Sequence, residues 1–98
     1  MRFGEAIVAA TAQKKKITRD GWNGKDMFVY YQPGSLKAVE DLPKDMCEAI
    51  KMWLLKNAST PLIKIHGHFD MKDAQGHIVI GWLASQTDML AEDWRVLE

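Results

Sequence analysis

The run WLASQTDMLAEDW, residues 82–94, is the densest cluster of aromatic rings and hydrogen-bonding side chains in the sequence. Trp82 and Trp94 bracket it. A purely structural segment of this length rarely needs so mixed a composition, whereas a binding surface does. Between the two tryptophans, small polar residues are followed by apolar ones: Ser85, Gln86, Thr87 and Asp88, then Met89, Leu90 and Ala91.

A second stretch of the same character, RDGWNGK, lies near the other end of the chain at residues 19–25. There Trp22 stands in a turn between two glycines, with charged groups on both sides. An exposed aromatic ring near Arg19 and Lys25 suits a flat ligand that carries phosphates. The alternative is a loop tryptophan tucked against its own sheet, and the residues alone favour neither interpretation.

The remaining segments predict alternating helices and strands. Phe3, Ile7 and Ala10 recur at helical spacing, as do Met46 and Ile50 after Pro43. The strands are runs of β-branched and aromatic residues bounded by Gly, Pro and Asn turns, and residues 33–41 indicate a loop or a single helical turn. The expected elements are helices over 3–14 and 43–57, strands over 16–19, 27–31, 62–71, 77–82 and 93–97, and a helical turn over 88–92.

This order predicts an α+β fold: an antiparallel sheet of about five strands, an N-terminal helix and a second helix inserted mid-chain. At 98 residues we expect a single domain over 1–98. A chain of this size buries only somewhat more than about 60% of its unfolded surface. With six methionines and four tryptophans to cover, it is expected to form an oligomer.

The net charge and the cysteine content limit the classes of function and the compartment that fit this chain. Thirteen basic and thirteen acidic residues cancel, so the chain lacks the positive charge that drives non-specific nucleic-acid binding, and an anionic ligand needs a local site. The single cysteine, Cys47, excludes an intramolecular disulfide and fits a reducing compartment. Since neither a signal-peptide pattern nor an apolar run of membrane-spanning length occurs, we expect a cytoplasmic protein.

Two chemical interpretations of the polar residues are disfavoured. His66, His68 and Asp70 alternate on an expected strand, but three ligands on one straight strand rarely converge on a metal ion. A hydrolase would use Ser85, Asp88 or Asp93 with a histidine, yet no nucleophile elbow, phosphate loop or metalloprotease helix is present. We therefore expect no metal site, cofactor or catalytic residue.

The other tryptophans have different expected roles. Trp53 lies on the apolar face of the 43–57 helix, which indicates core or a subunit interface. Trp94 begins a strand pattern and is expected to be structural. Trp82 ends a strand just before the polar run, a position typical of a pocket wall, with core packing as the rival interpretation.

The two tryptophan-bearing stretches lie in a pattern that resembles a known family of small phage and prophage proteins, the second type of Thoeris anti-defence protein. The strongest match is WLASQTD with LAEDW, residues 82–88 and 90–94. The other resembling residues are Phe3–Ala6, Gly21–Lys25 with Met27–Phe28, and Met71–Lys72 followed by Gly76.

The resemblance implies a sponge: a homotetramer, built as paired dimers, that traps without cleavage the cyclic ADP-ribose isomer made by a bacterial Thoeris system. Some relatives also hold cyclic dinucleotides from CBASS systems in separate pockets. Adenine favours a flat ring, a pyrophosphate favours Arg or Lys, and ribose favours small polar groups. The residues expected to bind the ligand are Arg19, Trp22, Asn23, Lys25, Trp82, Ser85, Gln86 and Asp88.

The chain departs from the family pattern in two places. Pro43–Asn57 adds a helical segment, which bears on assembly or on access to a pocket. Ile80–Gly81 stands where many relatives have a proline, which bears on the strand end that presents Trp82. The alternative function is that of a phage structural or regulatory protein that binds a host protein through the same aromatic surface and holds no nucleotide.

Overall fold

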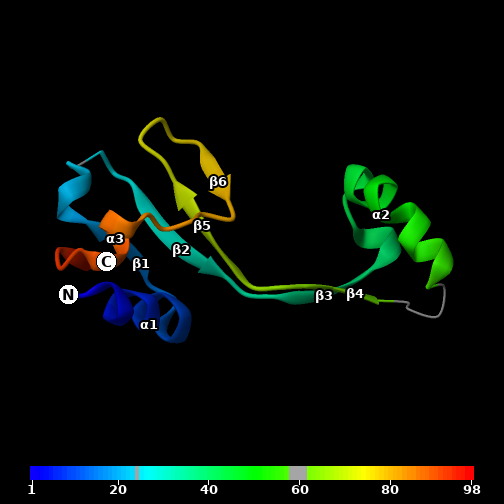
Figure 1. Ribbon diagram of the computed structural model, residues 1–98, viewed down its shortest axis with the longest axis horizontal. Coiled ribbons are helices and arrows are strands. Elements are labelled where there is room, and N and C mark those ends of the chain that lie inside the picture. The colour runs from blue at the N-terminus through cyan, green and yellow to red at the C-terminus, as the bar shows by residue number, and fades with distance from the viewer. Residues whose placement is uncertain (24, 58–61) are drawn as a thin grey trace. The chain divides into compact units, whose positions relative to one another are not determined.

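The computed structural model describes residues 1–23, 25–57 and 62–98, which form two compact units (Figure 1). The first contains Met1–Pro33 and His68–Glu98, and the second contains Gly34–Gly67. The first unit contains α1 (Phe3–Gln13), β1 (Lys16–Arg19), the 3-10 turn η1 (Asp20–Trp22), β2 (Phe28–Gln32), β5 (His68–Lys72), β6 (Ile78–Ile80), α3 (Gln86–Leu90) and β7 (Trp94–Leu97). The second contains β3 (Ser35–Ala38), the 3-10 turn η2 (Val39–Asp41), α2 (Lys44–Lys56) and β4 (Leu62–Ile65).

The first unit is built on a five-stranded sheet in the order β6-β5-β2-β1-β7, with every neighbouring pair antiparallel. The strand register aligns one row of apolar side chains across the whole sheet. Because side chains alternate along a strand, all members of this row lie on one face. In order across the sheet they are Val79, Met71, Val29, Ile17 and Val96.

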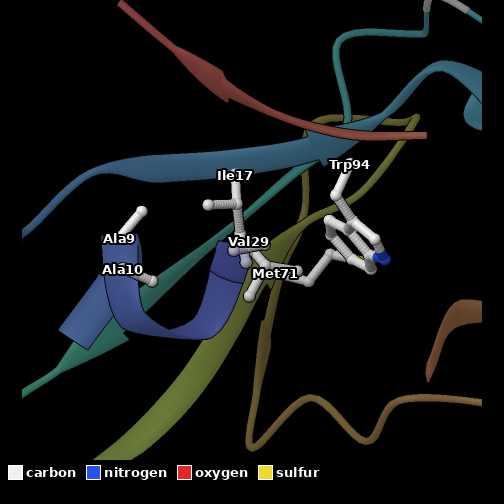
Figure 2. Packing of buried hydrophobic residues seen from close by; sticks show 7 residues of the cluster. Ala9, Ala10, Ile17, Val29, Met71 and Trp94 are labelled. Carbon is white, nitrogen blue, oxygen red and sulfur yellow. The ribbon is translucent and has the colours of Figure 1, made fainter. Parts of the chain in front are cut away.

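Helix α1 packs on this row through small residues. Ala6, Ala9 and Ala10 are buried, and their short side chains let the helix lie close to Ile17 and Val29, which are fully buried (Figure 2). Trp94 belongs to the same cluster and is 2% exposed. Its burial matches the structural role expected for it.

Most of the expected elements of the first unit are confirmed. The N-terminal helix, the first hairpin, β6 and the closing strand form within a residue or two of their expected bounds, and the expected second hairpin forms between β5 and β6. The α+β class, the five-stranded antiparallel sheet and the two helices are confirmed as well. The expected 88–92 turn begins earlier, at Gln86, because Ser85 caps it.

Two expectations for the middle of the chain were wrong. The segment 33–41, expected as a loop or a single helical turn, contains β3, which pairs with β4, and a helical turn forms only at its end, in η2. The strand expected over 62–71 is two strands, because β4 ends at Ile65 and β5 begins at His68. The backbone is tight at this point: a Cβ on Gly34 would lie 2.7 Å from Ile65 O and 2.9 Å from Gly67 N. Such an approach admits only glycine.

The second unit has little interior of its own among its described residues. Its two-stranded sheet is antiparallel, with Ser35 opposite Ile65. Helix α2 confirms the expected helix, but it contains no buried residue, and Trp53 is 50% exposed. A core role for Trp53 within one chain was therefore wrong, and its subunit-interface role stays a prediction.

Some expectations concern residues that the structure does not describe. Gly24, the second glycine of the expected turn around Trp22, and residues 58–61, which follow the expected 43–57 helix in the sequence, are not among the described residues. In the described ranges, every helix is too short or too polar to span a membrane. That the two units fold as a single domain stays a prediction.

Candidate functional site

Arg19, the last residue of β1, is clamped by two carboxylates. Its Nε donates to Asp93 Oδ1 at 2.8 Å and its Nη1 to Asp88 Oδ1 at 2.7 Å. Only 13% of the Arg19 side chain is exposed. The hydrogen bonds to Asp93 and then to Asp88 raise the pKa of Arg19, so the group is a permanent positive charge held in one orientation.

Asp88 joins this clamp to the first turn of α3. Its backbone N–H donates to Ser85 Oγ at 3.0 Å, and its Oδ2 accepts from Ser85 N at 3.4 Å, which forms a capping box. Its Oδ1 also accepts from Trp22 Nε1 at 3.2 Å. Burial works to raise the pKa of Asp88, but hydrogen bonds from Arg19, Ser85 and Trp22 outweigh it and hold that pKa below its ordinary value.

Asp93 holds the other side of Arg19 and the loop that follows it. Its Oδ2 accepts from Gly21 N at 2.7 Å. A Cβ on Gly21 would lie 2.9 Å from both Arg19 Nη2 and Asp93 Oδ2, so a larger residue here would displace the ends of these two paired side chains. The Arg19 guanidinium lowers the pKa of Asp93 against a smaller opposing effect of burial.

Three tryptophan rings meet beside the clamp. Trp22 lies edge-to-face on Trp94 with ring centres 5.3 Å apart, and on Trp82 with centres 6.3 Å apart. Trp82 and Trp94 are also edge-to-face, at 6.3 Å. The Nε1 of Trp94 donates to the backbone oxygen of Asp88 at 2.8 Å. Trp22 is thus partly tucked against its own unit, and its ring is held in place by packing and by one hydrogen bond.

Trp22 also lines a cleft of ≈ 210 Å³. Its charged lining comprises three cations, Arg19, Lys25 and Arg95, and two carboxylates, Asp20 and Asp26. Arg95 Nε donates to Asp20 Oδ1 at 2.7 Å, and both of these side chains are more than half exposed. Among the described residues, no hydrogen bond or ion pair occupies the Lys25 ammonium. The hydroxyl, cationic and aromatic side chains that line the cleft are those of Thr18, Arg19, Trp22, Lys25 and Arg95.

The structure divides the expected ligand residues into three groups. Arg19, Trp22 and Lys25 line the cleft. Trp82, Ser85 and Asp88 support Trp22 and Arg19 through ring packing and hydrogen bonds. Asn23 and Gln86 are exposed: Asn23 ends η1 with a φ of 59°, and Gln86 begins α3.

Sequence reasoning missed Asp93, Thr18 and Arg95. Asp93 was considered only as a candidate acid in a hydrolase. Its pairing with Arg19 was not predicted, because the two residues lie far apart in the sequence. Thr18 lies directly opposite Arg95 in the β1–β7 register, so the two share the face that borders the cleft. Both strands were predicted, and the pairing between them was the missing information.

The polar residues of β5 form a separate cluster. His68 Nε2 lies 3.3 Å from Asp70 Oδ1, which also accepts from Gly81 N at 3.0 Å. Burial, followed by the charge and hydrogen bond of Asp70, raises the pKa of Tyr30. Within the described ranges, no three His, Cys, Asp or Glu residues are grouped as metal ligands would be.

Comparison with known proteins gives two matches. The family model of the Thoeris anti-defense 2-like domain matches residues 1–97. A curated relative, Thoeris anti-defense 2 of Bacillus phage SP01, is 30% identical over 97 residues, which cover 99% of this chain and 94% of that protein. Both matches therefore include the cleft, the tryptophan cluster and the α2 segment.

Proposed function

The chain belongs to the Thoeris anti-defense 2-like family, and from this premise we propose that it binds a cyclic nucleotide immune signal and holds it without cleaving it. Family membership supports a phage anti-defence role. The proposed ligand is a cyclic ADP-ribose isomer of the Thoeris system, with cyclic dinucleotides of CBASS systems as a second ligand class. The proposed place of action is the cytoplasm of the bacterial host.

The observation that carries this proposal is the cleft beside Trp22. An aromatic ring flanked by Lys25 and Arg95 offers a stacking surface for a base and two cations for a pyrophosphate. Arg19 contributes differently, because Asp88 and Asp93 already occupy its guanidinium. We assign direct phosphate contacts to Lys25 and to Arg95, whose Nε is bound by the exposed Asp20, and we assign to Arg19 the role of holding the cleft wall in place through Asp88 and Asp93.

The residues behind the cleft act by keeping its wall in place. Asp88 binds both Trp22 and Arg19, and Ser85 orients Asp88 through the capping box. Trp82 packs on the edge of Trp22. The carboxylates of Asp88 and Asp93 are both engaged by Arg19, which suits binding better than acid–base catalysis.

The size of the cleft supports a site completed by another copy. Pockets for drug-sized ligands usually measure about 300 to 1,000 Å³, whereas this cleft measures ≈ 210 Å³. A cyclic nucleotide would extend beyond it. We propose that a second copy covers the remainder of the ligand, within a homo-oligomer expected to be a tetramer built as paired dimers.

Isothermal titration with cyclic ADP-ribose isomers and cyclic dinucleotides tests the ligand. We expect heat with a stoichiometry near one per site, weakened in Lys25→Ala and Arg95→Ala and unchanged in the matched control Lys51→Ala, which lies on exposed α2. The complex is then heat-denatured, and mass spectrometry of the released nucleotide should show it intact. A cleaved product would contradict the proposal, and the absence of heat with every nucleotide would favour the host-protein alternative.

A further inference from the structure

Strand β6 leaves an unprotected edge on the five-stranded sheet (Figure 1). Its three residues, Ile78, Val79 and Ile80, are 51%, 42% and 69% exposed. The opposite edge strand, β7, carries a charge at Arg95, a common protection against unwanted pairing. An edge strand that is exposed, uncharged and rich in β-branched residues can pair with a strand of another chain.

The hydrogen-bond pattern shows which backbone groups of β6 are available. Asp73 N donates to His77 O at 2.9 Å, so these residues form a hydrogen-bonded pair at the hairpin end. Such pairs alternate along an antiparallel ladder. Val79 therefore bonds to Met71, its partner in the register. The peptide groups of Ile78 and Ile80 point away from β5, towards the free edge.

We propose that β6 pairs antiparallel with β6 of a second copy of this chain, with Val79 on the two-fold axis. The sequence Ile78-Val79-Ile80 reads the same in both directions, so it matches itself in an antiparallel register. The outward groups of Ile78 meet those of Ile80 in the other copy, and the two sheets become one. Pairs of β-branched side chains directly opposite one another stabilise such a ladder.

The pairing also continues the packing inside each copy. Val79 ends the apolar row that begins at Val96, and a second Val79 would extend that row across the axis. Ile78 and Ile80 lie on the other face of the sheet, where each would cover its counterpart. The inference rests on the proposed homo-oligomer and names one of its interfaces, at the sheet edge opposite the β1–β7 side that borders the cleft. It is tested without nucleotide, so its failure leaves nucleotide binding in the single-chain cleft untouched.

The decisive experiment places charges on the axis. In this register Val79 faces Val79 of the other copy, so Val79→Lys and Val79→Glu each put like charges directly opposite one another. Light scattering coupled to size exclusion should show each variant alone at half the parent mass. An equimolar mixture should recover the parent mass as a one-to-one complex. The control Leu83→Lys, at a residue that is 90% exposed, should keep the parent mass.

A measurement on the unmodified chain guards against misfolded variants. Hydrogen exchange should find the outward amides of Ile78 and Ile80 protected, with protection lost on dilution below the dissociation constant. A monomeric parent, free exchange of these amides at high concentration, or variants that keep the parent mass would each overturn the pairing. A mixture that fails to recover the mass, while both variants stay folded by circular dichroism, would also overturn it.

Discussion

The Nη1 of Arg19 donates to Oδ1 of Asp88 at 2.7 Å and so joins two residues that lie 69 positions apart. The same carboxylate oxygen accepts from Trp22 Nε1, while its other oxygen accepts from Ser85 N. One carboxylate thus connects the cleft wall to the start of α3. The two polar stretches at opposite ends of the sequence are one cluster in the fold.

Asp88→Asn tests this connection. Asparagine keeps the shape but removes the charge that faces the mostly buried Arg19, which retains Asp93 as its remaining partner. Since a hydrogen bond to a charged group contributes about 1.5 to 3 kcal/mol, we expect the free energy of unfolding in urea to fall by about 2 kcal/mol. The control is Asp20→Asn, which breaks an exposed pair with Arg95 and should cost at most about 1 kcal/mol. Equal losses in the two variants would mean that Asp88 is not the central residue of the cluster.

Acid should destabilise the protein through Asp88 and Asp93. The pKa of each is lowered in the folded state, so the unfolded chain binds more protons and stability rises with pH in this window. The contribution is complete above the ordinary carboxyl pKa of about 3.9 and is lost as pH falls through the lowered folded values. Melting curves from pH 6 to pH 2 should show Tm falling most steeply below about pH 4. In Asp93→Asn, Tm should be lower at pH 6 and the fall shallower; an unchanged slope would contradict the assignment.

Trp94→Ala and Trp53→Ala should separate buried from exposed aromatic packing. Trp94 is 2% exposed, and loss of a buried tryptophan typically costs about 3 to 5 kcal/mol. Trp53 is 50% exposed, so its loss should change the free energy of unfolding by only about 0.5 kcal/mol. Denaturant titration of both variants checks the difference. A large loss in Trp53→Ala that grows with protein concentration would show that α2 is buried between subunits.

Trp22→Ala and Trp22→Phe test stacking in the cleft. If the ring stacks on the base of the ligand, alanine should remove about 1 to 3 kcal/mol of binding, a loss of roughly 5- to 150-fold in affinity. Phenylalanine should retain most of the affinity because it keeps an aromatic ring, even though it loses the hydrogen bond to Asp88. Titration gives the affinities, and melting curves give the stability of each variant. Should Trp22→Ala bind like the parent yet melt far lower, Trp22 is only a packing residue.

Local patterns determined most of the elements. Helical spacing with small residues predicted α1, and runs of β-branched and aromatic residues predicted β1, β2, β6 and β7. The split between β4 and β5 could not be predicted, because Leu62–Met71 is continuous in strand-forming residues. The close approach at Gly34 that accompanies the split comes from a different part of the chain.

By itself the sequence determined which residues are chemically suited to a site: the tryptophans, Arg19, Lys25 and the polar run before α3. Tertiary structure decided their roles. It placed Arg19 between Asp88 and Asp93 and left Lys25 and Arg95 beside the cleft. Whether a segment forms a helix or a strand depends on residues a few positions apart in the sequence. An ion pair across 69 positions depends instead on the strand register that aligns β1 with β7.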